Sequence, residues 1–207
     1  QQEFEVIFRD NALTVFSNFE SCFDGKFNGG KCWCGIDPSS VGDDNTIISI
    51  VNKDNNVRQY KIEGSLDQKY DKIARIINEY NPTATYIENN SIGEVMANEI
   101  KKKLNNKANF YTFTTTNETK KQYISLLAVD IANNEIHFEP DNRLLYSEMG
   151  TFSFKLTKGG NITYAAREGY HDDTVTSLGI ALQCMDDFKL SGTPSLNFVN
   201  KIIPQII

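Results

Sequence analysis

The sequence predicts an α/β domain built on a mixed five-stranded sheet flanked by helices, with an additional β-hairpin. Three observations lead to this class. Apolar β-rich runs fill the first part of the chain, and segments of helical period alternate with strands after residue 65. Two of the short apolar runs end in a carboxylate, Asp37 and Glu88. No run of about 18 apolar residues occurs, so no membrane-spanning helix is predicted.

Length and composition indicate one packed core. The chain has 207 residues, of which 40% are hydrophobic and 23% are charged, values ordinary for a folded globular protein. We expect an irregular segment or linker at 1–30, the α/β domain at 31–188 and a tail at 189–207. The first residues lack a basic region followed by an apolar stretch, so we expect an intracellular protein that is not secreted.

The charge of the chain argues against a tight, stand-alone nucleic-acid binder. The net charge is -6 and the isoelectric point is about 5.0, whereas affinity for phosphates comes mostly from lysine and arginine. A local basic face, bound metal ions or a partner domain would have to compensate. The four cysteines show no zinc-type spacing to the two histidines, which predicts buried, reduced thiols.

Three strands are predicted first, at 31–37, 46–51 and 57–62. Each is rich in β-branched, aromatic or other apolar residues, and the turn-forming segment 52–56 separates the last two. Consecutive strands joined by such short links form an antiparallel meander.

The pattern then changes to strands alternating with helices. A helix is predicted at 66–80, before Asn81 and Pro82, because its apolar residues recur at helical spacing. A strand follows at 83–88, then a helix that begins with a capping box from Ser91 to Glu94. The remaining predicted elements are a strand at 109–113, a helix at 117–132, a brief extended segment at 135–138, a short helix at 141–150, a hairpin at 152–156 and 161–165, and a final apolar helix that begins near Asp172 and Asp173.

The predicted topology brings acidic side chains together. A meander followed by right-handed crossovers gives the strand order 3-2-1-4-5, in which the strands ending at Asp37 and Glu88 are neighbours. Clustered carboxylates repel one another unless cations neutralise them. Oxygen ligands of this kind suit Mg²⁺ or Mn²⁺, and two such ions would support phosphodiester cleavage.

Three local sequences resemble those of one family. They are Gly35-Ile36-Asp37-Pro38-Ser39, the segment from Tyr86 to Gly93, and the segment from Ala165 to Asp173. Together they resemble the C-terminal nuclease domain of the large terminase subunit of tailed bacteriophages, within the RNase H-like superfamily, over about residues 30 to 188. The resemblance implies an endonuclease that cuts double-stranded viral DNA with little sequence preference during genome packaging, in the host cytoplasm.

The resemblance also implies roles for the acidic residues. Asp37 would bridge two divalent cations, Mg²⁺ or Mn²⁺, and Glu88 would bind one of them. Asp173 is expected to be the third ligand because it lies deeper in the helix, and Asp172 is expected to be an auxiliary ligand. The catalytic set is therefore Asp37, Glu88 and Asp173.

Further expectations concern DNA and partner proteins. By resemblance, the hairpin and its lysines, Lys155 and Lys158, would lie over the DNA path. A terminase ATPase domain, a small terminase subunit and a portal are the implied partners. The chain departs from the family in lacking an intact phosphate-binding loop, so it is interpreted as a nuclease domain separated from its motor.

Alternative functions remain open at this stage. The same fold and acids would serve an RNase H-like Holliday-junction resolvase, which a preference for four-way junctions would reveal. A non-catalytic docking module would fail to bind metal. An actin-like ATP-binding fold also places an aspartate after its first strand, and it would retain nucleotide.

Overall fold

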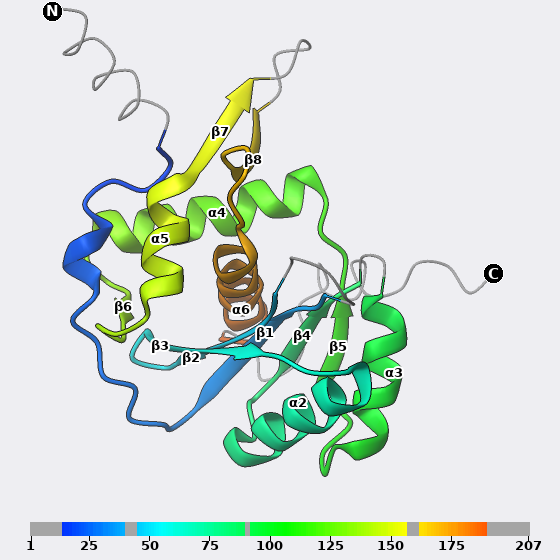
Figure 1. The fold of residues 1–207 in the computed structure, drawn as a ribbon. Helices are drawn as coiled ribbons and strands as arrows, with labels where there is room; N and C mark the ends of the chain where they lie inside the picture. Colours follow the sequence, from blue (N-terminus) through cyan, green and yellow to red (C-terminus); the bar gives the residue numbers. More distant parts are fainter. Residues whose placement is uncertain (1–13, 40–44, 90–91, 157–161, 190–207) are drawn as a thin grey trace, which may run out of the picture.

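The computed structural model describes residues 14–39, 45–89, 92–156 and 162–189. They form a mixed sheet covered by helices on both faces, together with a separate two-stranded hairpin (Figure 1). Within these residues no helix is both long and apolar enough to cross a bilayer. The elements in chain order are η1 (Phe19–Cys22), β1 (Cys32–Asp37), β2 (Thr46–Asn52), β3 (Asn56–Ile62), α2 (Leu66–Tyr80), β4 (Thr85–Glu88), α3 (Gly93–Lys103), β5 (Phe110–Phe113), α4 (Asn117–Ala132), β6 (His137–Phe138), α5 (Arg143–Thr151), β7 (Phe152–Leu156), β8 (Ile162–Ala166) and α6 (Asp173–Lys189).

The strand order of the main sheet is β5-β4-β1-β2-β3-β6. Strands β1, β2 and β3 are antiparallel neighbours, and β4 and β5 run parallel to β1. The predicted order 3-2-1-4-5 and the antiparallel second strand are therefore confirmed. The structure adds a sixth strand, β6, which pairs in parallel with β3 through only two residues. A strand that short leaves no periodic pattern in the sequence.

Helices α2 and α3 cover one face of the sheet, and α4, α5 and α6 lie on the other (Figure 1). Because strand side chains alternate between faces, β1 contributes Cys34 and Ile36 to the α2/α3 side and Trp33 to the α6 side. Helix α6 is buried along nearly its whole length. The centre of the fold is therefore the crossing of α6 over β1 and β2.

The crossing of α6 over β1 depends on Gly35. A Cβ atom at this position would lie 2.3 Å from the backbone nitrogen of Ala181 and 2.4 Å from the carbonyl oxygen of Ser177. Both atoms belong to the helix backbone, which cannot turn aside as a side chain can. The absence of a side chain at Gly35 thus sets how closely the helix that carries Asp173 approaches the strand that carries Asp37.

Side-chain capping boxes begin two helices for which none was predicted, and the one predicted capping box does not begin its helix. Helix α2 has a capping box from Ser65 and Gln68, and α4 has one from Thr116 and Thr119. Helix α3 differs from the prediction, because it begins at Gly93 and its cap residue, Ile92, makes no side-chain capping bond. Ser91, the predicted capping residue, lies outside the described residues.

The described part of the N-terminal segment, residues 14–30, packs onto the core. Phe16, Phe19, Cys22 and Phe27 are buried there, with only the single turn η1 as regular structure. These side chains therefore contribute to the core of the described structure. All four cysteines are buried and free, which confirms the prediction of reduced thiols.

The predicted hairpin is formed by β7 and β8, which pair in antiparallel register from Phe152 opposite Ala166 to Leu156 opposite Ile162. It extends away from the sheet (Figure 1). Lys155 lies in β7 opposite Thr163. Lys158, the second lysine predicted to contact DNA, lies outside the described residues.

Candidate active site

The ends of two parallel strands and one helix meet at one edge of the sheet. Ile36 pairs with Ile87, so Asp37 and Glu88, the next residues, end neighbouring strands side by side. Helix α6 begins with Asp173 and packs across β1 and β2. The negative charges of Glu88, Asp173 and Asp172 all act on Asp37. The structure therefore brings together the four acidic residues that the sequence singled out.

Asp37 is the centre of this cluster. Its pKa is raised well above its ordinary value, first because the carboxyl group is buried, and next because Glu88 and Asp173 are negatively charged. A hydrogen bond with Glu88 and the charge of Asp172 raise it further. The ionised form of Asp37 is therefore disfavoured here, and a bound cation would stabilise it.

Asp173 is buried and held by a neighbour from the start of β2. Its Oδ2 accepts hydrogen bonds from the backbone nitrogen of Asn45, at 2.8 Å, and from the Asn45 side-chain nitrogen, at 3.1 Å. Because β2 runs antiparallel to β1, the residue just before it lies at the same edge as Asp37. Asn45 thereby fixes one oxygen of the Asp173 carboxylate.

Asp172 has a different partner. Its Oδ2 lies 2.9 Å from Nζ of Lys120 on α4, and the two side chains are 26% and 20% exposed. The same ammonium lies 5.9 Å from the ring centroid of Phe152, at the base of the hairpin. Lys120 is thus a cation between the acid cluster and the hairpin.

A second residue of α4, Tyr123, also faces the cluster. Its side chain is fully buried, and its pKa is raised first by burial and then by the charges of Glu88, Asp37 and Asp172. The hydroxyl makes no hydrogen bond of good geometry with the described residues, although Thr176 lies near enough to lower its pKa slightly against these effects. Helix α4 therefore places a phenol beside the acids.

The approach of α3 to the cluster depends on Gly93. A Cβ atom there would lie only 1.7 Å from the carbonyl oxygen of Glu88, so any side chain would push the start of α3 away from the end of β4. Close packing of α3 against the end of β4 therefore requires glycine at position 93, within the motif that follows Glu88.

The donor set fits a divalent cation in its chemistry. Four carboxyl groups influence one another here, and Lys120, which pairs with Asp172, cannot balance them alone. Hard oxygen donors of this kind suit Mg²⁺ or Mn²⁺. Among the described residues, no three His, Cys, Asp or Glu side chains already converge as a ready-made metal site. Instead, the acids interact with neighbours. Asp37 is hydrogen-bonded to Glu88, Asp173 accepts a hydrogen bond from Asn45, and Asp172 forms an ion pair with Lys120.

Three residues of this edge, Asn45, Lys120 and Tyr123, were not predicted from the sequence. A signal for Asn45 existed, because the residue preceding β2 in an antiparallel pair must lie near the end of β1. Lys120 and Tyr123 are three residues apart, so they share a face of α4. Which neighbour this face meets depends on helix packing, which the sequence pattern does not specify.

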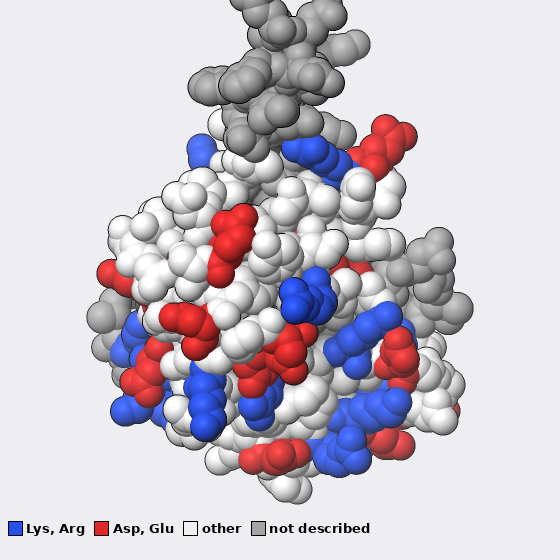
Figure 2. Space-filling view, turned by 60° about the vertical axis from the view of Figure 1, so that its left-hand side comes forward, with Lys and Arg blue, Asp and Glu red and all other residues white. Residues whose placement is uncertain are grey.

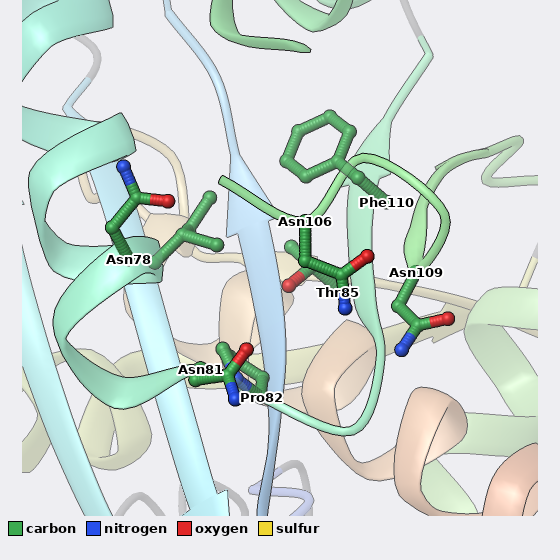
Figure 3. Close-up of a pocket in the computed structure, with 8 residues that line it drawn as sticks. Asn78, Asn81, Pro82, Thr85, Asn106, Asn109 and Phe110 are labelled. Carbon is green, nitrogen blue, oxygen red and sulfur yellow. The ribbon is translucent and has the colours of Figure 1, made fainter. Parts of the chain in front are cut away.

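One hollow lies away from the acids, and another lies near them. The first, shown in Figure 3, has a volume of only about 10 Å³, and its lining includes Thr85, the first residue of β4, whereas Glu88 is the last. It is thus at the opposite end of the sheet and has room for about one water molecule. The second has a volume of about 410 Å³ and borders the first turn of α6 at Thr174.

The surface charges are mixed. On the face drawn in Figure 2, lysine and arginine side chains are interspersed with acidic ones over the described residues. This matches the net charge of -6.

Comparison with known proteins identifies the family. The family model described as "Terminase RNaseH-like domain" matches residues 34–184, which include all four acids. No curated protein sequence is similar enough to count as a relative.

Solved structures share the fold at low sequence identity. The large terminase nuclease from thermophilic phage G20c is 18% identical with a TM-score of 0.69, and the match covers 83% of this chain and 98% of that one. The nuclease domain of the large terminase subunit gp2 of bacterial virus Sf6 is 13% identical with a TM-score of 0.65, covering 84% and 98%. The HK97 bacteriophage large terminase is 14% identical with a TM-score of 0.66, covering 82% of this chain and 43% of that one.

The family match spans well over half of the sequence. The chain therefore belongs to the family of terminase RNase H-like domains.

Proposed function

We propose that this protein is a metal-dependent endodeoxyribonuclease that cuts double-stranded viral DNA, with little sequence preference, during genome packaging in the host cytoplasm. The observation that carries the proposal is the meeting of Asp37, Glu88 and Asp173 at one edge of the sheet, where Asp37 is half-buried and surrounded by negative charges. A cluster of partly buried acids is destabilising, so it is best explained by a function.

Asp37, Glu88 and Asp173 are the residues that would hold two divalent cations, Mg²⁺ or Mn²⁺, with Asp172 as an auxiliary ligand. When bound, such ions supply an activated water and charge stabilisation for phosphodiester hydrolysis. Support comes from the relatives, because the G20c nuclease has been solved with bound magnesium and with bound cobalt. Asp173 is preferred over Asp172 because Lys120 already neutralises Asp172.

The remaining residues position these ligands or the DNA. Asn45 holds one oxygen of Asp173 and so fixes the orientation of its carboxylate. The hairpin β7–β8 emerges next to Lys120 through Phe152, so Lys155 and Lys158 are proposed to contact the DNA backbone. The terminase ATPase domain, the small subunit and the portal are the proposed partners, and the nuclease domain is proposed to span 31–188, between a linker at 1–30 and a tail at 189–207.

The decisive test is cleavage of supercoiled plasmid. The protein should nick and linearise plasmid in Mn²⁺ or Mg²⁺, and EDTA should stop the reaction. Asp37→Ala should abolish cleavage, and Asp173→Asn should reduce it far more than Asp172→Asn. Unchanged cutting by Asp37→Ala, in a preparation that retains the fold by circular dichroism, would falsify the assignment of the site.

Two alternative functions can be tested with the same purified protein. A Holliday-junction resolvase uses the same acids, so a strong preference for a four-way junction over linear duplex would favour that function. A non-catalytic docking module is favoured if calorimetry detects no binding of Mn²⁺ to the protein.

A further inference from the structure

Thr174, the residue directly after Asp173, is held by all three of its polar atoms. Its backbone nitrogen and its hydroxyl both donate to Oε2 of Glu148, at 2.8 and 2.5 Å. Its carbonyl oxygen accepts a hydrogen bond from Nε2 of Gln59, at 2.9 Å. Thr174 is 1% exposed. The first turn of α6 is therefore fixed from outside the helix.

Glu148 itself is an unusual residue for its position. It lies on α5 and is only 4% exposed, although a buried carboxylate costs free energy unless it is well hydrogen-bonded. Burial raises its pKa and the charge of Asp173 raises it further, whereas the Thr174 bonds and the backbone of Val175 act in the opposite direction. A carboxylate is favourable at the positive end of a helix, so Glu148 acts as an acceptor at the start of α6.

The Gln59 side chain is itself held by hydrogen bonds to other elements. The side-chain oxygen of Gln59 accepts a hydrogen bond from Asn142, whose own oxygen caps the start of α5. The Gln59 nitrogen also donates to Ser49 on β2. Helix α5 thus reaches Thr174 by two routes, directly through Glu148 and indirectly through Asn142 and Gln59.

We propose that Glu148 is a positioning residue for Asp173. It accepts two hydrogen bonds from Thr174, the residue after Asp173, and so fixes the start of α6. This inference rests on the proposed function, because it assigns Glu148 to the same metal-binding cluster. Asp173 is the first residue of α6, so a small shift of this turn displaces its carboxylate relative to Asp37 and Glu88. Ligand geometry tolerates displacements of only about 0.5 Å.

A purely structural role for Glu148 predicts something different. A simple cap would stabilise the fold, and its loss would lower the melting temperature without changing how the folded fraction binds metal. A positioning role predicts weaker metal binding in protein that is still folded, since residues that orient metal ligands typically contribute about 10- to 100-fold to metal affinity or activity.

The test measures the Mn²⁺ dependence of plasmid cleavage and the binding of Mn²⁺ by calorimetry, for the full chain. Glu148→Gln keeps the size of the side chain but removes the charge and replaces one acceptor oxygen with a donor. We expect its half-saturating Mn²⁺ concentration to rise about 10-fold or more. Glu135→Gln is the matched control, because Glu135 is exposed, and it should behave as the wild type.

A second pair of variants keeps the inference testable if Glu148→Gln does not fold. Thr174→Val removes only the hydroxyl donor to Glu148 and should weaken Mn²⁺ binding. Thr174→Ser retains the donor and should bind Mn²⁺ as the wild type does. Combined with Glu148→Gln, Thr174→Val should add little, because both act through the same hydrogen bond.

The outcomes separate this inference from the function on which it rests. Wild-type Mn²⁺ dependence in folded Glu148→Gln, or equal Mn²⁺ dependence in Thr174→Val and Thr174→Ser, overturns the positioning role while leaving the nuclease intact. If the wild-type protein neither binds Mn²⁺ nor cuts DNA, the proposed function fails, and the role of Glu148 fails with it.

Discussion

Nζ of Lys120 lies 2.9 Å from Oδ2 of Asp172, which makes Lys120 a cation paired directly with the acid cluster. Asp173, the neighbouring acid, is held by the neutral residue Asn45 instead. Two adjacent aspartates therefore have different electrostatic surroundings. This difference supports the proposal that Asp173 is the main metal ligand and Asp172 the auxiliary one.

The Lys120 pair leads to a prediction about metal affinity. In Lys120→Met, Asp172 loses its counter-charge and the cluster gains one net negative charge, so Mn²⁺ should bind more tightly. Because the pair is partly exposed, about 0.5–1 kcal/mol is expected, or roughly a 2- to 5-fold lower dissociation constant by calorimetry. Lys121→Met is the control, because Lys121 is exposed on the same helix. Weaker Mn²⁺ binding in Lys120→Met would contradict this view of the pair.

The raised pKa of Asp37 predicts how stability depends on pH in the metal-free protein. Above the ordinary pKa of 3.8 and up to the raised one, the folded state binds more protons than the unfolded state. The contribution of Asp37 to the free energy of unfolding is therefore fully present below its pKa in the unfolded chain. It is lost as the pH rises through its pKa in the folded protein. Thermal unfolding in EDTA should show this decline across the acid to neutral range.

Asp37→Asn should remove that decline. The variant should be more stable than the wild type at neutral pH, and each 1 kcal/mol gained should raise the melting temperature by about 2–4 °C. It should cut no DNA. Asp186→Asn, which changes an exposed aspartate on α6, should keep the wild-type pH profile. A melting temperature of Asp37→Asn below that of the wild type at pH 8 would show that burial of the charge is not costly here.

The hairpin lysines should affect DNA binding without affecting metal binding. Replacing Lys155 and Lys158 with alanine should weaken binding of linear duplex, because fewer counterions are released. The slope of the logarithm of affinity against the logarithm of salt concentration should fall by about 0.9 for each phosphate that is no longer neutralised. Lys53→Ala is the control, since Lys53 lies in the turn after β2, at the other end of the sheet from Asp37. Unchanged affinity and slope in the double variant would remove the hairpin from the DNA path.

Gly35→Ala should destabilise the protein. The added Cβ would meet the α6 backbone at 2.3 and 2.4 Å, and overpacking of this kind costs about 1–3 kcal/mol. Gly150→Ala is a matched control on α5, because the nearest atom to its Cβ would be Cζ of Phe19 at 3.8 Å. Chemical denaturation of both variants measures the difference. Equal stabilities would mean that α6 can move away from β1 at little cost.

Much of the fold follows from local patterns in the sequence. The helices at 66–80 and 117–132 were predicted with the bounds that the structure shows, because their apolar residues recur at helical spacing within each segment. The ends of β1 and β4 at Asp37 and Glu88 were also predicted, since a carboxylate ends each apolar run. The start of α3 was not predicted, because it lacks a side-chain cap. The extended segment at 135–138 was predicted, but not its pairing with β3 as strand β6, because two residues show no period.

The sequence by itself determined which acids end the central strands and open the buried helix, because strand ends, helix starts and burial are written in local residue patterns. Only the tertiary structure decided what surrounds each acid. Lys120, Asn45 and Glu148 come from different elements, and each reaches α6 or the loop before it through packing of whole helices and strands. These interactions join residues 26 to 128 positions apart, and no local periodicity encodes a distance of that kind.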